Sequence, residues 1–270
     1  MSKLENNASH VQSVARALQA LELLAEENRE LTLTEMSNKL KWPKSTLHGI
    51  LTTLRDYRVV DQSAENGRYR LGIRLFEFGQ KVTRSWDIHS LAIPVMQGLN
   101  RMFGEMVQLA TEDSGEVLYI EKLDSTHIIR IVSETGARLP MHCSGLGKTL
   151  LAYKSPAEVK RILTKSGMPR MTRNTITDLP RMNAELEKIR RQGYAVDDRE
   201  IMEGLRCVAA PIYDRNGEVK YAISVSSIAE VLFGDYFDSV RMEVVKAADE
   251  ISYLMGYRKI EQSEGIENGQ

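Results

Sequence analysis

The chain contains little cysteine. Only Cys143 and Cys207 carry thiols among its 270 residues, too few for the disulfide framework of a small secreted domain, so we expect both to be free thiols in a reducing compartment. No stretch approaches the roughly 18 consecutive apolar residues of a membrane-spanning helix. Residues 1–7 also have no apolar signal-peptide core. These absences argue against disulfide-rich secreted proteins and membrane proteins and predict a cytoplasmic location, away from any membrane.

The hydrophobic fraction of 42% suffices for packed cores, and the length predicts two domains. A net charge of −1 argues at first against nucleic acid as a partner. The charges are unevenly placed, however. Residues 1–37 carry 3 basic and 6 acidic side chains, a net −3, whereas residues 38–74 carry 8 basic and 3 acidic ones, a net +5. Positive charge therefore gathers in one short segment, as in proteins that bind nucleic acid.

Residues 32–56 have the pattern of two short helices separated by a turn. Thr32 and Glu35 have the spacing of a capping box, which predicts a helix start. A break follows at residues 41–43, and Pro43 suits the first turn of the next helix. The apolar residues of that helix share one face: Leu47, Ile50, Leu51 and Leu54. A further helix is predicted over residues 11–27, where apolar residues also recur at helical spacing.

The opposite face of the second helix carries short polar and basic side chains that a DNA major groove can accept. These are Lys44, Ser45, Thr46, His48, Gly49, Thr52 and Arg55. Next, an Asn66-Gly67 turn between two strand-like runs predicts a β-hairpin. Arg68 and Arg70 alternate with Tyr69, so both would lie on one side of a wing and reach phosphates or the minor groove. The alternative is a three-helix fold that binds protein.

Residues 73–86 predict a linker helix whose apolar stripe forms a dimer seam or packs on its own wing. Beyond it, residues 91–103 predict a helix interrupted or opened at Pro94. The remaining pattern predicts strands over residues 106–110, 117–121, 128–132, 207–213 and 219–226, and helices over residues 145–153, 156–166, 179–192 and 235–256. The second domain is thus expected to be an α+β domain with an antiparallel sheet.

Two segments of this domain carry the candidate chemistry. Gly147-Lys148-Thr149 suggests a phosphate-binding P-loop, but position 142, where a P-loop needs glycine, is His142. A glycine-rich helix start at residues 144–147 still offers backbone N–H groups to an anion such as a carboxylate. Ser224 and Ser226 share one strand face and could bind the polar end of a ligand. Apolar walls would come from Ile128, Leu139, Leu146 and Leu205.

Residues 11–18 (VQSVARAL), 43–46 (PKST) and 68–72 (RYRLG) resemble the isocitrate lyase regulator (IclR) family of bacterial transcription factors, and the resemblance extends over residues 10–258. It implies a winged helix-turn-helix at 10–73, a linker helix at 74–87 and a GAF/profilin-like effector-binding domain at 88–258. The family often has a larger side chain at Gly49, so one base contact is in question. The implied effector positions are Ile128, Leu139, Gly145, Leu146, Asp197, Leu205, Cys207, Ser224 and Ser226.

The sequence also contains cysteine, histidine and aspartate residues that could in principle form a catalytic or a metal site. Cys207, Cys143, His142 and Asp197 could converge on zinc, but they lack the short paired spacing of a dedicated site. His142 and Cys143 would diverge on a regular strand and do not form a nucleophile–base pair. We therefore expect no metal, no cofactor and no catalytic residue.

The expected function is a DNA-binding repressor that responds to a small organic acid. It would act as a homodimer or dimer of dimers on a pseudo-palindromic double-stranded operator. Two alternatives remain. One is a small-molecule enzyme joined to a DNA-binding domain, and the other is an architectural DNA binder without a ligand.

Overall fold

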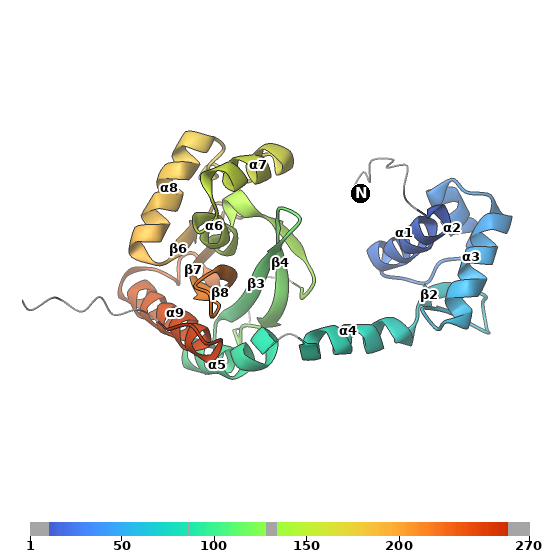
Figure 1. Cartoon of the computed structure of the whole chain (residues 1–270), viewed down its shortest axis with the longest axis horizontal. Coiled ribbons are helices and arrows are strands. Elements are labelled where there is room, and N and C mark those ends of the chain that lie inside the picture. Colours follow the sequence, from blue (N-terminus) through green and yellow to red (C-terminus); the bar gives the residue numbers. More distant parts are fainter. Residues whose placement is uncertain (1–10, 86, 128–133, 259–270) are drawn as a thin grey trace, which may run out of the picture. The chain divides into compact units, whose positions relative to one another are not determined.

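The computed structural model describes residues 11–85, 87–127 and 134–258, with only the backbone of residues 82–85 and 87. The chain divides into two compact units between residues 85 and 86 (Figure 1). We call them the N-terminal and the C-terminal unit. In the described part of the chain, no helix is both long and apolar enough to cross a membrane.

The N-terminal unit combines helices with a two-stranded hairpin. Its elements are α1 (Gln12–Glu27), α2 (Leu33–Leu40), α3 (Lys44–Asp56), β1 (Val60–Gln62), β2 (Tyr69–Leu71) and α4 (Ile73–Ser85). The predicted helix-turn-helix and wing are therefore confirmed. Strands β1 and β2 pair antiparallel, with Asp61 opposite Arg70.

The turn between α2 and α3 is held by local hydrogen bonds. Thr32 and Glu35 form the predicted capping box at the start of α2. Lys41 ends the helix in the left-handed conformation, with φ of 58°. The hydroxyl of Ser37 then donates to the Trp42 carbonyl at 2.7 Å. Pro43 is the N-cap of α3 rather than a residue of its first turn, so α3 begins one residue later than the proline predicted.

The core of the N-terminal unit joins α1, α2 and α3 to the wing. Its buried members include Leu24 of α1, Leu47 of α3 and Tyr69 of β2. The helical repeat that predicted α1 lies mostly outside this core: Val11, Val14 and Leu18 are each more than half exposed. The repeat located the helix correctly, but the side turned inward presents Ala20 and Leu24.

A glycine joins the wing to α4. A Cβ atom at Gly72 would lie 2.2 Å from the carbonyl oxygen of Arg58, which no side chain can accept. The N–H of Gly72 donates to the Val59 carbonyl at 2.8 Å. This close backbone approach fixes the end of α3 against the wing, and so positions the wing beside that helix.

The C-terminal unit is an antiparallel α+β domain, as predicted. Its elements are α5 (Asp87–Phe103), β3 (Met106–Asp113), β4 (Glu116–Leu123), β5 (Arg138–Pro140), the 3₁₀ turn η1 (Met141–Cys143), α6 (Gly145–Ala152), α7 (Pro156–Ser166), α8 (Leu179–Gln192), β6 (Ala195–Asp198), β7 (Leu205–Tyr213), β8 (Val219–Ile228) and α9 (Gly234–Leu254).

Two details of this domain differ from the sequence prediction. Pro94 lies inside α5, which starts at Asp87 and neither opens nor breaks there. The short strands β5 and β6 were not predicted, because three or four residues carry too little alternation to stand out. The strand predicted over 128–132 lies outside the described residues.

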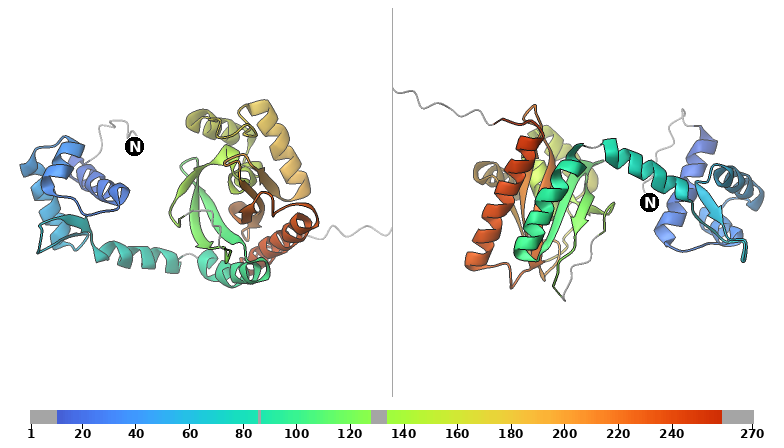
Figure 2. Two further views of the ribbon diagram at one scale, coloured as in Figure 1. Left: turned by 180° about the vertical axis from the view of Figure 1, so that it is seen from behind. Right: turned by 90° about the horizontal axis from the view of Figure 1, so that it is seen from below.

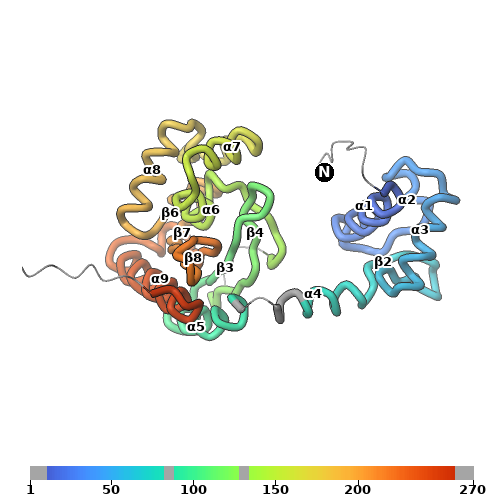
Figure 3. Tube along the Cα trace, in the orientation of Figure 1, coloured from blue at the N-terminus to red at the C-terminus, as the bar shows by residue number. Residues whose placement is uncertain are grey.

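The six described strands form one sheet in the order β5-β4-β3-β8-β7-β6, and every neighbouring pair is antiparallel. Helices α5 and α9 lie side by side over one face (Figure 2). Helices α6, α7 and α8 lie on the other (Figure 3). The sheet is thus covered on both sides, which explains why β7 and β8 are buried along most of their length.

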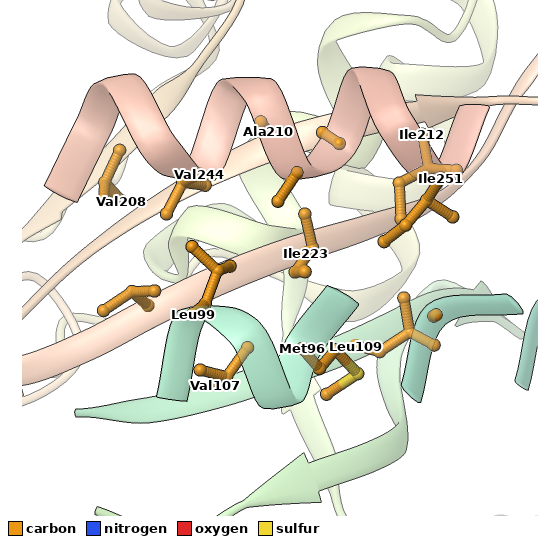
Figure 4. Packing of buried hydrophobic residues seen from close by; sticks show 14 of the residues in the cluster. Met96, Leu99, Val107, Leu109, Val208, Ala210, Ile212, Ile223, Val244 and Ile251 are labelled. Atoms are coloured by element: carbon orange, nitrogen blue, oxygen red, sulfur yellow. The ribbon is translucent and has the colours of Figure 1, made fainter. Parts of the chain in front are cut away.

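Side-chain alternation along the strands divides the residues between the two faces. Val107 and Leu109 of β3, with Ile223 of β8, pack under α5 and α9 (Figure 4). Their neighbours on the same strands point to the other face, toward α6. That second face carries polar residues at Gln108, Ser224 and Ser226, all buried. Buried polar groups on an otherwise apolar face mark this region as a candidate site.

Candidate DNA-reading surface and ligand cavity

Helix α3 presents the predicted reading residues on its outer side. Lys44, Ser45, His48, Gly49 and Arg55 are exposed, and Thr46 and Thr52 are partly buried, whereas the opposite face buries Leu47 and Leu51. A Cβ atom at Gly49 would meet nothing within 4 Å, so the glycine is not required by the fold.

The wing arginines are paired with carboxylates of their own unit. Arg70 contacts Asp61 at 2.7 Å and Glu30 at 3.1 Å, and Arg68 contacts Glu35 at 3.3 Å. The Arg70 guanidinium, through its hydrogen bond, lowers the pKa of Asp61. Sequence reasoning placed both arginines toward phosphates or the minor groove and did not predict these ion pairs. Any contact they make with phosphates has to compete with these ion pairs.

The second site is a cavity of about 170 Å³ between the sheet and the start of α6. Eight of the nine predicted effector residues line it, and the ninth, Ile128, lies outside the described residues. The full lining is Met106, Gln108, Tyr119, Ala137, Leu139, Ser144, Gly145, Leu146, Asp197, Ile201, Met202, Leu205, Cys207, Ser224 and Ser226. Residues from all six described strands of the sheet, from the start of α6, and from the segments before β5 and after β6 thus surround a single space.

A polar network forms the sheet side of the cavity. The hydroxyl groups of Ser226 and Ser224 donate to Oε1 of Gln108 at 2.9 and 3.4 Å. Gln108 lies opposite Ser224 in the pairing of β3 with β8. Burial raises the pKa of the Tyr119 phenol, and a hydrogen bond with Gln108 partly opposes this rise. A ligand in the cavity would therefore meet hydroxyl groups held in fixed positions.

The start of α6 forms the second polar part of the wall. The hydroxyl of Ser144 accepts from the Gly147 N–H at 3.1 Å, capping the helix. The Gly145 N–H contributes a hydrogen bond to the Cys207 thiol. Two of the backbone N–H groups predicted to bind an anion, those of Gly145 and Gly147, therefore already have protein partners, and fewer N–H groups than expected remain for a ligand. A Cβ atom at Gly147 would lie 2.3 Å from the Met141 carbonyl oxygen, so close packing requires this glycine.

Asp197 brings a buried carboxyl group to the cavity. It is 1% exposed, and its Oδ1 accepts the Glu200 N–H at 2.7 Å. Its Oδ2 has no hydrogen-bond partner among the described residues. Burial raises the pKa of Asp197 to about 7. The nearby Lys148 ammonium is itself buried and contacts Glu200, with Glu185 at 3.6 Å.

The thiols and the histidine near the cavity have the properties of packing groups. Burial raises the pKa of Cys143 and of Cys207 to about 12, so neither is a thiolate at neutral pH. Nε2 of His142 lies 3.0 Å from the Pro169 carbonyl. In the described part of the chain, no three His, Cys, Asp or Glu side chains gather as they would around a metal ion.

Sequence reasoning missed several residues that line the cavity: Met106, Gln108, Tyr119, Ala137, Ile201 and Met202. Gln108 left a usable signal, because it is a polar residue inside the apolar run 106–110. The others look like ordinary strand or loop residues, and only the strand order places them at one site.

Comparison with known proteins matches the chain to two family domains. The IclR helix-turn-helix domain matches residues 13–64, and the bacterial transcriptional regulator IclR C-terminal domain matches residues 80–253. The chain is 35% identical to the HTH-type transcriptional regulator XynR of Escherichia coli K12 over 247 residues, which are 92% of this chain and 98% of that protein. It is 34% identical to the transcriptional repressor IclR of the same organism, covering 91% of this chain and 90% of that one.

A solved structure is also similar over nearly the whole length. It is an IclR homologue from Microbacterium hydrocarbonoxydans complexed with 4-hydroxybenzoate, with a TM-score of 0.82 and 25% identity, covering 90% of this chain and 98% of that one. A helix-turn-helix in the N-terminal unit, a cavity in the C-terminal unit and these likenesses lead to one assignment: the chain belongs to the IclR family of bacterial transcriptional regulators.

Proposed function

We propose that this protein is a repressor whose hold on its operator is changed by a small organic acid bound in the C-terminal cavity. The observation that carries the proposal is the cavity of about 170 Å³, which has hydroxyl groups on its sheet side and a helix start opposite them. Ligand sites are typically concave and apolar with a few placed polar groups. As a repressor of bacterial genes, the protein would act in the cytoplasm.

The N-terminal unit supplies the proposed DNA contacts. Helix α3 would enter the major groove with Thr46 and His48 toward the base edges, while Lys44 and the wing arginines approach the backbone. The two kinds of contact have different roles: base-edge contacts specify the DNA sequence, and phosphate contacts position the protein on the duplex.

A carboxylate is the proposed anchor of the effector. The cavity places the positive end of α6 near Ser144 and Gly145, and the Ser224 and Ser226 hydroxyls at the sheet. A helix start favours an anion through its N–H groups and dipole. An apolar body would pack on Leu139, Leu146 and Leu205. The bound 4-hydroxybenzoate of the Microbacterium relative has this general character.

Two copies are proposed to assemble through the N-terminal units. The outward face of α1 carries Val11, Val14 and Leu18, each at least 56% exposed, and α4 exposes Phe76 at 63%. Large apolar side chains on the outside of two helices fit a second copy of the same chain. A dimer, or a dimer of dimers, would present two copies of α3 to a pseudo-palindromic operator.

The effector would act by changing the populations of these assemblies. It must bind one geometry more tightly than another, because a ligand that binds both equally shifts nothing. The enzyme alternative would need an activated nucleophile at the cavity. Burial keeps the Cys207 thiol protonated. The Ser224 and Ser226 hydroxyls donate to Gln108, and the described lining holds no histidine or lysine to activate them.

The test is a thermal-shift panel of pyruvate, glycolate, benzoate and 4-hydroxybenzoate with the full chain, followed by operator release for each acid that binds. At about 100 times its Kd, a ligand adds roughly 2.7 kcal/mol of stability. Ser226→Ala should weaken binding by about 1–3 kcal/mol, because the polar partners in the cavity lose a hydrogen bond. Ser239→Ala is the matched control, since that residue is exposed and its hydroxyl donates to the Asp235 carbonyl of its own helix.

Binding of an acid without any change in operator affinity would contradict the regulatory proposal. An equal loss of ligand affinity in Ser226→Ala and Ser239→Ala would contradict the assigned cavity.

The proposed assembly is tested separately. Leu18→Glu should give a smaller species in light scattering than Gln19→Glu, because only the first removes an exposed apolar side chain. Identical masses for the two variants would place the interface elsewhere.

A further inference from the structure

The cavity has an unusual charge balance for a site that receives an acid. In the described lining there is no lysine, arginine or histidine. The one carboxyl group among these residues is Asp197, and it is 1% exposed. An anionic ligand would therefore be buried beside an acidic side chain with no cation lining the same space.

The nearest buried cation has other partners. Nζ of Lys148 contacts the Glu200 carboxylate and lies 3.6 Å from Glu185. Lys148 itself is 1% exposed and is not part of the cavity lining. Glu185 also has Lys188, an exposed side chain, at 3.8 Å. This cluster, together with Asp197, therefore sets two positive charges against three carboxyl groups, and of the two cations Lys148 is the buried one. Lys148 therefore cannot also balance the charge of a ligand.

Asp197 has one oxygen ready for a further hydrogen bond. Its Oδ1 accepts from the Glu200 N–H, and its Oδ2 is buried without a partner among the described residues. The titratable groups that face it come from every element packed around it: Glu200 from its own loop, Lys148 from α6, Cys143 from η1, Cys207 from β7 and Tyr119 from β4, with Glu185 of α8 beyond Lys148.

Two buried negative charges at close range are costly, because the interior screens them poorly and neither has a cation of its own. A single proton removes this cost. A protonated Asp197 is neutral, and its O–H can donate from Oδ2 to an oxygen of the ligand.

We propose that an acidic effector binds this cavity together with one proton from solvent, and that Asp197 holds that proton as the hydrogen-bond donor to the ligand. This rests on the proposed function, in which the cavity takes an organic acid. No covalent bond forms or breaks except the O–H of the carboxyl group. Because Asp197 must be protonated to donate this hydrogen bond, the affinity for the effector depends on pH.

The pKa of Asp197 in the ligand-free protein agrees with this role. Burial raises the pKa of Asp197 to about 7, so a proton is readily available near neutral pH. A bound anion raises that pKa further. Below the pKa of the empty site the proton is already present, and Kd should be constant. Above it the proton must be taken up, and Kd should rise about tenfold for each pH unit.

The experiment is calorimetric titration of the full chain with each acid from the panel that binds, with 4-hydroxybenzoate as the first probe. Titrations run from about pH 6 to pH 8.5, in Tris and in HEPES, because the heat difference between buffers counts the protons taken up. At the alkaline end the expected uptake approaches one proton per ligand, and Kd should be at least about tenfold weaker than at pH 6. The neutral amide of the same acid should show no uptake.

Asp197→Asn keeps a hydrogen-bond donor at this position but removes the titratable proton. Its amide N–H can donate to the ligand but cannot titrate, so Kd should stay within a few-fold of the wild-type value at pH 6 and should not vary with pH. Asp198→Asn is the matched control. Asp198 is the next residue along β6, is exposed, and pairs with Arg206 at 3.3 Å. This variant should keep the wild-type pH profile.

The possible outcomes separate the role of Asp197 from the proposal that the cavity binds an organic acid. Binding of an acid with a flat pH profile and no proton uptake overturns the role of Asp197 and leaves the effector cavity standing. A Kd that tightens as pH rises overturns it as well. If no acid of the panel binds at any pH, the proposed function fails and this inference fails with it. Should Asp197→Asn not fold, the proton count of the wild-type protein decides alone.

Discussion

A single methyl group at Gly145 should reveal how closely α6 is held against the sheet. A Cβ atom there would lie 2.7 Å from Sγ of Cys207, whereas ordinary contacts are 3.4–4 Å. The sulfur belongs to a buried side chain with little room to move. Overpacking of this kind costs about 1–3 kcal/mol. For a domain of this size, 1 kcal/mol corresponds to a shift of about 2–4 °C in Tm, so Gly145→Ala should lower Tm by roughly 2–12 °C.

The same geometry predicts which second change restores stability. After Sγ of Cys207, the nearest atom to the added methyl group is Cβ of Ala209 at 3.5 Å, an ordinary contact. Cys207→Ala removes the sulfur and should cost some stability by itself through lost packing. The double variant should then be about as stable as Cys207→Ala alone, giving a coupling free energy of about 1–3 kcal/mol.

Scanning calorimetry of the full chain measures this cycle through the transition of the C-terminal unit. Gly98→Ala in α5 is the matched control, because its added Cβ would meet nothing within 4 Å. That change should raise stability by up to about 1 kcal/mol, since alanine favours a helix over glycine. If the costs of Gly145→Ala and Cys207→Ala simply add, the close packing of α6 on β7 inferred from this contact is wrong.

Three further predictions follow from other contacts. Asp61→Asn combined with Glu30→Gln should remove both ion pairs of Arg70, at 2.7 and 3.1 Å, raising DNA affinity at low salt and steepening the salt dependence by about one phosphate contact. Asp197 binds its proton more tightly in the folded chain, so its contribution to stability should fall as pH rises from about 4 through about 7; Asp197→Asn should make this fall smaller in calorimetry, while the contribution of Glu200, whose pKa burial also raises, remains. Gly72→Ala should lower the Tm of the N-terminal unit alone, because its Cβ would lie 2.2 Å from the Arg58 carbonyl oxygen.

Local signals predicted the helices and hairpin of the N-terminal unit well. The Thr32–Glu35 spacing fixed the start of α2, because both partners of a capping box lie within four residues. The buried face of α1 could not be predicted in the same way. Its apolar repeat includes Val14 and Leu18, yet the core contacts come from Ala20 and Leu24. Periodicity identifies a helix, whereas its partners decide which side is covered.

The cavity shows a similar division between local and distant information. Ser224 and Ser226 were predicted to share a face because alternation along a strand is local. Gln108 was missed, since it reaches them only through the register of β3 with β8, more than 100 residues away along the chain. The ion pairs of Arg68 and Arg70 were missed for the same reason, as their carboxylate partners include Glu30 and Glu35 of an earlier segment.

The two buried thiols have a practical consequence for observing the regulator at work. Cys143 and Cys207 are at most 5% exposed and have strongly raised pKa values, so maleimide reagents should react slowly with both. A cysteine introduced on the exposed side of α3, for instance by Ser45→Cys, would take a spin label selectively in the otherwise native sequence. In the proposed dimer, electron–electron distance measurements between two labelled copies would then report the separation of their α3 helices directly, before and after an acid is added.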